Sequence, residues 1–272
     1  MAIRTAAELL KIEVLGPVEW VTLNRPEALN ALNPALIEDL RDYFLGLADR
    51  KDVRVVVLKG EGRAFCAGLD LKTESSANET ASAGDVQRGL KTQRRIAEIV
   101  MAMRRCPQPV ISLIRGPACG GGFSLALASD IRIAGESARM NCAYIRIGLG
   151  GCDIGSSYFL PRLVGASVAA ELILTGKFIN AERALRLGLV SRVVADEDLE
   201  RAALEDIDYM LATSPLGLRL SKEALNINLD AGGLEAAIAL EDRNQILCAQ
   251  TEDFREGLRA FLTRQKPNWK DA

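Results

Sequence analysis

Short runs of β-branched residues alternate with segments of helical spacing along this chain of 272 residues. Each run is closed by turn-forming residues, and the predicted strands are Val18–Leu23, Val53–Leu58, Val110–Ile114, Ile131–Ile133 and Val190–Val194. Parallel neighbours in a sheet need a long crossover connection, which is usually a helix. The alternation therefore predicts an α/β fold with a largely parallel sheet.

The clearest helix start is Asn33-Pro34, because Asn is a good N-cap and Pro suits the first helical position. Between Lys72 and Leu90 the chain holds few core residues, so we expect a surface loop or mobile flap there. Beyond Asn33 the apolar residues with helical spacing are Leu36, Leu40, Phe44 and Leu47.

From about Asp196 onward the strand signals end and the pattern is helical. Ser214-Pro215 is predicted to begin one helix. We divide the chain into a core of residues 1–195 and a helical region of residues 196–272, which packs on its own core or on a neighbouring subunit. An apolar stripe on another helix of this region is formed by Phe254, Leu258, Phe261 and Leu262.

The charge balance and the missing histidine exclude several function classes. Thirty-four Lys and Arg face 36 Asp and Glu, a formal charge of −2, so nucleic acid is not an expected partner. The chain has no histidine, which excludes Ser-His-Asp and Cys-His catalysis and histidine-ligated metal sites. Proton transfer must then fall to Asp, Glu, Tyr, Cys or Lys, and we expect no metal.

The six cysteines form no CxxC pair, and we expect free thiols in a cytoplasmic protein. The start of the chain has no hydrophobic block typical of a secretory signal. The longest uncharged stretch, Gly116–Ser129, is too short and too rich in glycine to span a bilayer. No membrane span is therefore predicted.

Two glycine-containing loops follow predicted strands. The first, Arg63–Leu71 (RAFCAGLDL), comes after Val53–Leu58, and the second, Arg115–Ser124 (RGPACGGGFS), comes after Val110–Ile114. Glycine lets a ligand approach the backbone, and a helix N-terminus attracts negative charge. The alternative is that Gly120–Gly122 only eases a tight turn. Nucleotide motifs of the GxGxxG and GxxxxGK[ST] types do not occur in suitable places.

Together, in this order, the two loops resemble those of the crotonase superfamily, also called the enoyl-CoA hydratase/isomerase family. The resemblance runs from Leu23–Leu32 (LNRPEALNAL) to Phe261–Pro267 (FLTRQKP), almost the whole chain. It implies a crotonase-type spiral of ββα units with a C-terminal α-helical region, and homotrimers that often pair into hexamers. It also implies an acyl-CoA or enoyl-CoA substrate in fatty acid metabolism. Coenzyme A is part of that substrate, so no separate cofactor is expected.

The resemblance places the oxyanion-hole N–H groups of the family on Leu69 and Gly121. Two fixed backbone donors, one at a helix N-terminus, suit the stabilisation of an enolate at a thioester carbonyl. For the two arginines that the resemblance places near coenzyme A, the alternative is an ordinary solvated charge. The residues expected to contact coenzyme A are Arg25, Ala28, Ala67, Leu69, Asp70, Leu71, Lys72 and Arg264.

The chain departs from the family at both hydratase glutamates. Crotonase-type hydratases use two glutamates to add water, and the resemblance places these on Ser124 and Tyr144. Serine and tyrosine are too weakly acidic to exchange protons alone near neutral pH. The family's standard two-carboxylate hydration is therefore not expected.

One carboxylate, Asp153, lies between glycines before a predicted helix. Aligned on Leu160–Gly165, it matches the catalytic aspartate of dienoyl-CoA isomerases and the nucleophile of chlorobenzoyl-CoA dehalogenases. The dehalogenases also need a histidine, so we set that activity aside. A partly desolvated aspartate can serve as the single base that moves a double bond. The alternative is that Asp153 caps the following helix.

Two hypotheses follow. In the first, the chain is an enzyme that polarises an acyl-CoA carbonyl with the Leu69 and Gly121 amides and transfers protons with Asp153, while Tyr144 or Ser124 orders a water. In the second, the chain keeps the fold but is a non-catalytic acyl-CoA-binding or carrier protein.

Overall fold

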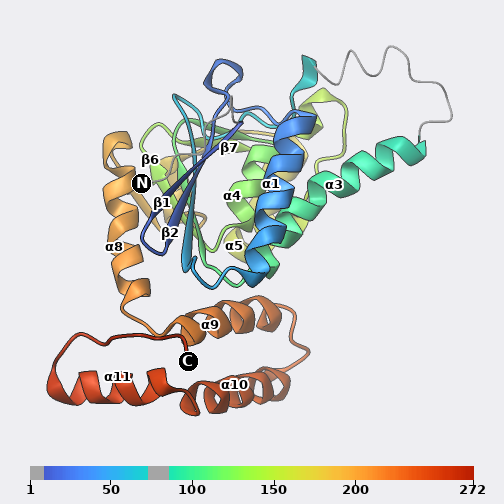
Figure 1. The fold of residues 1–272 in the computed structure, drawn as a ribbon. Coiled ribbons are helices and arrows are strands. Elements are labelled where there is room, and N and C mark those ends of the chain that lie inside the picture. Colours follow the sequence, from blue (N-terminus) through green and yellow to red (C-terminus); the bar gives the residue numbers. More distant parts are fainter. Residues whose placement is uncertain (1–8, 73–85) are drawn as a thin grey trace.

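The computed structural model describes residues 9–72 and 86–272, and Figure 1 shows a central sheet with helices around it. The sheet has six strands in the order β1-β2-β3-β4-β6-β9. β1 pairs antiparallel with β2, and every later pair is parallel, which confirms the α/β prediction. The strands are β1 (Leu10–Leu15), β2 (Val18–Leu23), β3 (Val55–Gly60), β4 (Val110–Ile114), β6 (Ile131–Gly135) and β9 (Arg192–Val194).

The central strands are apolar on both faces because both faces are covered. In β3, Val56 and Leu58 belong to the larger core, which also includes the buried residues of α1 (Pro34–Gly46), α3 (Val86–Arg105) and α4 (Gly121–Ala128). Val55 and Val57 of the same strand belong to a second core, with α8 (Leu199–Leu211). Alternate side chains of one strand thus serve two hydrophobic layers.

Helix α1 begins where the sequence predicts. The Asn33 side chain accepts a hydrogen bond from the N–H of Leu36 at 2.9 Å, and Pro34 is the first helical residue. Leu36, Leu40 and Phe44 are buried at helical spacing. The cap and the apolar stripe therefore both agree with the predicted helix.

A second sheet of three short strands was not predicted. It has the order β5-β7-β8, with β5 (Pro117–Cys119), β7 (Arg139–Asn141) and β8 (Ile179–Asn180). Runs of two or three residues carry too little pattern to read from sequence. The remaining short elements are η1 (Pro26–Ala28), η2 (Leu47–Asp49), η3 (Ala143–Ile147), η4 (Asp196–Asp198), α5 (Ser156–Val164), α6 (Ala166–Thr175) and α7 (Ala181–Arg186).

The last three helices form a layer below the core in Figure 1. They are α9 (Pro215–Asn228), capped by Ser214 as predicted, α10 (Leu234–Ala249) and α11 (Glu252–Thr263). A buried lysine of α9, Lys222, ties this layer to the core: its Nζ donates to the carbonyls of Met103 (2.9 Å) and Gln108 (2.7 Å) and contacts the carboxylate of Asp130 (2.9 Å).

The prediction of a loop between Lys72 and Leu90 is wrong at its end, because Val86–Leu90 form the first turns of α3. Residues 86–90 are all exposed, so the helix has no apolar stripe there for a sequence pattern to detect. Residues 73–85 lie outside the described residues. All six cysteines are free thiols, as predicted. Across residues 9–72 and 86–272, we find no helix both long and apolar enough to span a membrane.

Candidate active site

The two glycine-containing loops lie side by side. The N–H of Cys66 donates to the carbonyl of Pro117 at 3.1 Å, and the N–H of Cys119 donates to the carbonyl of Cys66 at 2.9 Å. A Cβ at Gly122 would collide with the Cys66 carbonyl oxygen, and one at Gly68 (φ +95°) would lie 2.7 Å from the Cys119 oxygen. Glycine is therefore required for the close approach of the loops, beyond easing a turn.

This approach brings Gly68, the residue before Leu69, next to the start of α4, because a Cβ on Gly68 would lie 3.6 Å from the backbone nitrogen of Gly121. Leu32 donates to the Gly68 carbonyl at 2.7 Å and accepts from the Asp70 N–H at 3.0 Å, so the polar groups of Leu69 between them face away from Leu32. Gly121 is the first residue of α4, where a helical N–H has no partner within its helix. Within the described ranges, neither N–H donates to a backbone carbonyl.

The space beside Gly121 is apolar. A Cβ at Gly121 would lie 3.1 Å from Cδ1 of Leu32 and 3.6 Å from Cδ1 of Ile154. Ile154 has a φ of +44°, a left-handed conformation that is rare for a β-branched residue. Such strained residues cluster at functional sites, and this one directly follows Asp153.

Ser124 and Tyr144, which the resemblance aligns with the hydratase glutamates, are hydrogen-bonded to each other. Their hydroxyl oxygens are 2.9 Å apart, and both residues are buried. Burial raises the pKa of the Tyr144 hydroxyl far above its ordinary value. The Tyr144 ring also packs against Gly120, so the pair lies next to the start of α4.

The carboxylate of Asp153 is half-buried and accepts a hydrogen bond from the side-chain amide of Gln93 on α3. Burial raises the pKa of Asp153, and the backbone N–H of Ile154 and the Gln93 amide oppose this shift. Helix α5 has Gly155 at its N-cap and no side-chain cap, so the capping alternative for Asp153 is wrong. The Ser124 hydroxyl lies 3.4 Å from the Asp153 carbonyl oxygen.

Arg25 forms an ion pair with Asp70 at 2.9 Å, and it also donates to the carbonyl of Ala31. The two side chains are only 15% and 13% exposed, so the alternative of a solvated charge is wrong for Arg25. The pair joins η1, which ends at Ala28, to the first loop. Of the other residues expected to contact coenzyme A, Ala67 and Leu69 are in the same loop, whereas Leu71 at its end and Lys72 after it are exposed.

A cavity of about 610 Å³ opens at the start of the two loops and is also lined by Leu29. Arg63 and Arg115, which open the two loops, line it together with Arg139 of β7. Asp196 is the acidic residue in its wall and lies 3.5 Å from Arg115. Three guanidinium groups against one carboxylate favour an anion. Sequence reasoning missed this cluster because only the fold brings Arg139 to the loops.

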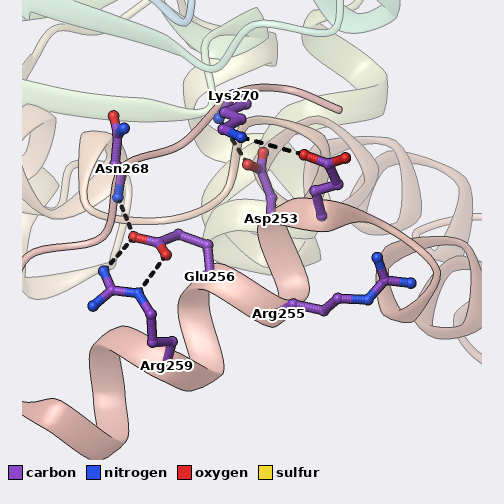
Figure 2. A pocket seen from close by; sticks show the side chains of 7 residues that line it. Asp253, Arg255, Glu256, Arg259, Asn268 and Lys270 are labelled. Carbon is purple, nitrogen blue, oxygen red and sulfur yellow. Dashed lines mark hydrogen bonds and ion pairs between the residues drawn. The ribbon is translucent and has the colours of Figure 1, made fainter.

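Arg264 does not join these residues within one chain. It is exposed and caps the end of α11, in the layer that lies below the core in Figure 1. A second cavity, about 470 Å³, is next to α11 (Figure 2). Its charges are largely paired with each other, as in Glu256–Arg259 and Glu252–Lys270. We therefore interpret these residues as the contacts that hold the end of the chain against α11, and not as a ligand site.

Comparison with known proteins identifies the class. The chain matches the enoyl-CoA hydratase/isomerase family over residues 15–272. It is 37% identical to the probable enoyl-CoA hydratase EchA12 of Mycobacterium tuberculosis, over 98% of this chain and 95% of the relative. It is 36% identical to the 1,2-epoxyphenylacetyl-CoA isomerase of Escherichia coli, over 96% and 98%.

The fold agrees with this assignment. The structure of enoyl-CoA hydratase from Bacillus anthracis superposes with a TM-score of 0.90 at 32% identity, covering 97% of this chain and all of that one. The chain therefore belongs to the enoyl-CoA hydratase/isomerase family and has the crotonase fold with a C-terminal helical region.

Proposed function

We propose that this chain is an isomerase of unsaturated acyl-CoA thioesters in which Asp153 alone exchanges the protons. The observation that carries the proposal is the half-buried Asp153 carboxylate, which directly precedes Ile154, whose Cδ1 would lie 3.6 Å from a Cβ on Gly121. A carboxyl whose pKa is raised toward neutral is a better general base and acid than an ordinary aspartate. Moving a double bond needs one group that removes a proton and returns it, whereas hydration must also deliver a water.

The reaction can be written for a 3-enoyl thioester. The thioester oxygen accepts hydrogen bonds from Leu69 and Gly121, and the Asp153 carboxylate removes a proton from the α-carbon. The electron pair of the broken C–H bond becomes a dienolate, and the negative charge on its oxygen is stabilised by the two N–H groups and the α4 dipole. The Asp153 carboxylic acid then returns the proton to the γ-carbon, which yields the conjugated 2-enoyl thioester.

The basic residues support binding of the nucleotide part of coenzyme A. The cavity lined by Arg63, Arg115 and Arg139 also includes Leu29, the residue after Ala28, and so adjoins the predicted coenzyme A contacts. Guanidinium groups bind phosphate with two parallel hydrogen bonds. The charge of Arg25 is already paired with Asp70, so this pair would hold the first loop in place and would not bind phosphate.

The C-terminal layer supports an oligomer. Its apolar side chains are left exposed by residues 9–72 and 86–272 of the chain, and Arg264 would reach coenzyme A only in a neighbouring copy. We propose a homotrimer or a dimer of trimers, at work in the cytoplasm. The exposed residues include Leu225, Leu234, Ile246, Phe254, Leu258, Phe261 and Leu262.

A non-catalytic acyl-CoA-binding or carrier protein is the second candidate. It is favoured by the Ser124–Tyr144 hydrogen bond, because the two hydroxyls satisfy each other where hydratases carry carboxylates. Such a protein would bind acyl-CoA without exchanging its protons.

The experiment is proton exchange in heavy water. Purified protein is incubated with 3-enoyl-CoA, 2-enoyl-CoA and a saturated acyl-CoA, and deuterium incorporation and double-bond position are followed by mass spectrometry and absorbance. We expect isomerisation with deuterium uptake, reduced about 10²–10⁴-fold in Asp153→Asn. Binding without uptake of deuterium would favour the carrier, and steady addition of water would favour a hydratase.

A further inference from the structure

The contact between Gln93 and Asp153 joins two elements that the chain keeps far apart. Gln93 lies in the first half of α3, and its amide Nε2 donates to Oδ1 of Asp153 in the loop before α5, 60 residues away in the sequence. A glutamine amide cannot take up or release a proton in this pH range, so it acts on the carboxylate only as a donor or acceptor of a hydrogen bond.

Helix α3 holds Gln93 in a fixed place. Ile96, Val100 and Met103 follow it at helical spacing and are buried in the core. Val100 reaches the loop before α5, since its Cγ1 would lie 3.6 Å from a Cβ on Gly155. The other side of α3 is tied to α1 through the ion pair of Arg41 with Glu98. The glutamine therefore approaches Asp153 from a packed helix.

We propose that Gln93 is a positioning residue that aims the Asp153 carboxylate at the substrate and keeps it in its basic form. This inference rests on the proposed role of Asp153 in proton transfer. A hydrogen bond from Gln93 favours the carboxylate over the carboxylic acid, because only the carboxylate accepts it with full negative charge. Without this donor, only the N–H of Ile154 would oppose the effect of burial, and the basic form would decrease near neutral pH.

Few other groups compete for Asp153 in the described part of the chain. The N–H of Ile154 donates to it, and Tyr144, the titratable group that faces it from η3, stays neutral because its pKa is raised. Cys152 precedes it in the sequence and is exposed. No charged side chain of the described ranges is among the groups that shift its pKa. Gln93 is thus the side chain through which the basicity of Asp153 can be changed from α3.

The test compares Gln93→Leu with Gln93→Lys. The leucine variant removes the donor, and the lysine variant supplies a donor with a positive charge. In the pH profile of kcat/KM, we expect the acid-side midpoint to rise by about one pH unit in Gln93→Leu and to fall by a similar amount in Gln93→Lys. Thr92→Leu, at an exposed neighbouring position of α3, is the matched control and should leave the midpoint in place.

The two proposals fail in different ways. If Asp153→Asn retains full activity, the proposed function is wrong, and the role of Gln93 in positioning Asp153 for proton transfer is rejected with it. If Asp153→Asn is inactive but both Gln93 variants keep the wild-type midpoint, Gln93 has no role in proton transfer. If the acid-side midpoint moves in the same direction in Gln93→Leu and Gln93→Lys, the proposal is also rejected. A common shift would come from altered packing, which does not depend on the charge of the new side chain.

Discussion

The hydroxyl oxygens of Ser124 and Tyr144 lie 2.9 Å apart in a buried hydrogen bond, directly beside the start of α4. Two hydroxyl groups that are hydrogen-bonded to each other stabilise the local fold, and both are poor acids and bases near neutral pH. In the proposed mechanism, proton transfer therefore falls to Asp153, whose backbone carbonyl oxygen lies 3.4 Å from the Ser124 hydroxyl oxygen.

Tyr144→Phe tests this division of roles. The change removes the partner of a buried serine hydroxyl, so we expect the free energy of unfolding to fall by about 1 kcal/mol. Activity should decrease less than tenfold, because Asp153 still transfers the proton and only a small displacement of the bound substrate is expected. Urea unfolding and the isomerase assay measure both effects. Tyr209→Phe, at a side chain that is 74% exposed, is the control. A loss of activity as large as that of Asp153→Asn would instead make Tyr144 the proton-transferring group.

Gly121→Pro tests the backbone donor. Proline is well accepted at the first position of a helix, and it removes the N–H that would bind the thioester oxygen while adding ring carbons beside Leu32. We expect kcat to fall about 10²–10³-fold. Gly121→Ala keeps the N–H and adds a methyl group 3.1 Å from the flexible end of Leu32, so it is the matched control. Equal activity in the two variants would show that this N–H takes no part in the reaction.

Asp153→Asn should separate stability from activity. Burial raises the pKa of Asp153, so the folded state holds its proton at pH values where the unfolded chain has lost it. The ionised carboxylate therefore lowers the free energy of unfolding. This effect is absent below the pKa of the unfolded chain, about 3.9, and grows as the pH rises through the pKa of the folded state.

We therefore expect Asp153→Asn to unfold at a higher urea concentration than the wild type at neutral pH, while its activity should be about 10²–10⁴-fold lower. At about pH 3, below the ordinary pKa of aspartate, the difference should vanish. Urea midpoints at the two pH values provide the measurement. A variant less stable than the wild type at neutral pH would mean that the carboxylate contributes more to folding than its burial removes.

Lys222→Met tests the connection between the C-terminal layer and the core. The ammonium is buried and contacts two carbonyls and the Asp130 carboxylate, so its removal leaves a partly buried charge without this partner. We expect a loss of about 3 kcal/mol in the free energy of unfolding and faster proteolysis between α8 and α9. Lys51→Met, at an exposed position, should change neither quantity.

The strands of the core could be predicted because burial on both faces makes them continuous apolar runs, as in Val55–Leu58 of β3. Strand β1 was missed because it is an edge strand with four of its six residues exposed. The first turns of α3 were missed for the same reason, since residues 86–90 have no buried side. Sequence patterns detect elements through the core that they bury, and exposed elements leave a weaker signal.

The candidate site was predictable only in part. The loops around Leu69 and Gly121 were found from their residues and from the family resemblance, and the structure brings them together. Gln93 was missed because its proposed role depends on a contact with a residue 60 positions away. Residues whose importance comes from one distant partner carry no local signal.

The pairing of the two loops has a consequence for how this protein can change over generations. Both N–H groups belong to the main chain, so replacing a side chain in either loop deletes neither of them, proline excepted. Their separation follows from the backbone bonds between Cys66 and the segment Pro117–Cys119. In the proposed mechanism, the two N–H groups that polarise the carbonyl are thus shielded from nearly all point mutations, whereas the proposed proton transfer depends on a replaceable side chain, Asp153. New activities can arise here by single exchanges without rebuilding the part of the site that is hardest to reinvent.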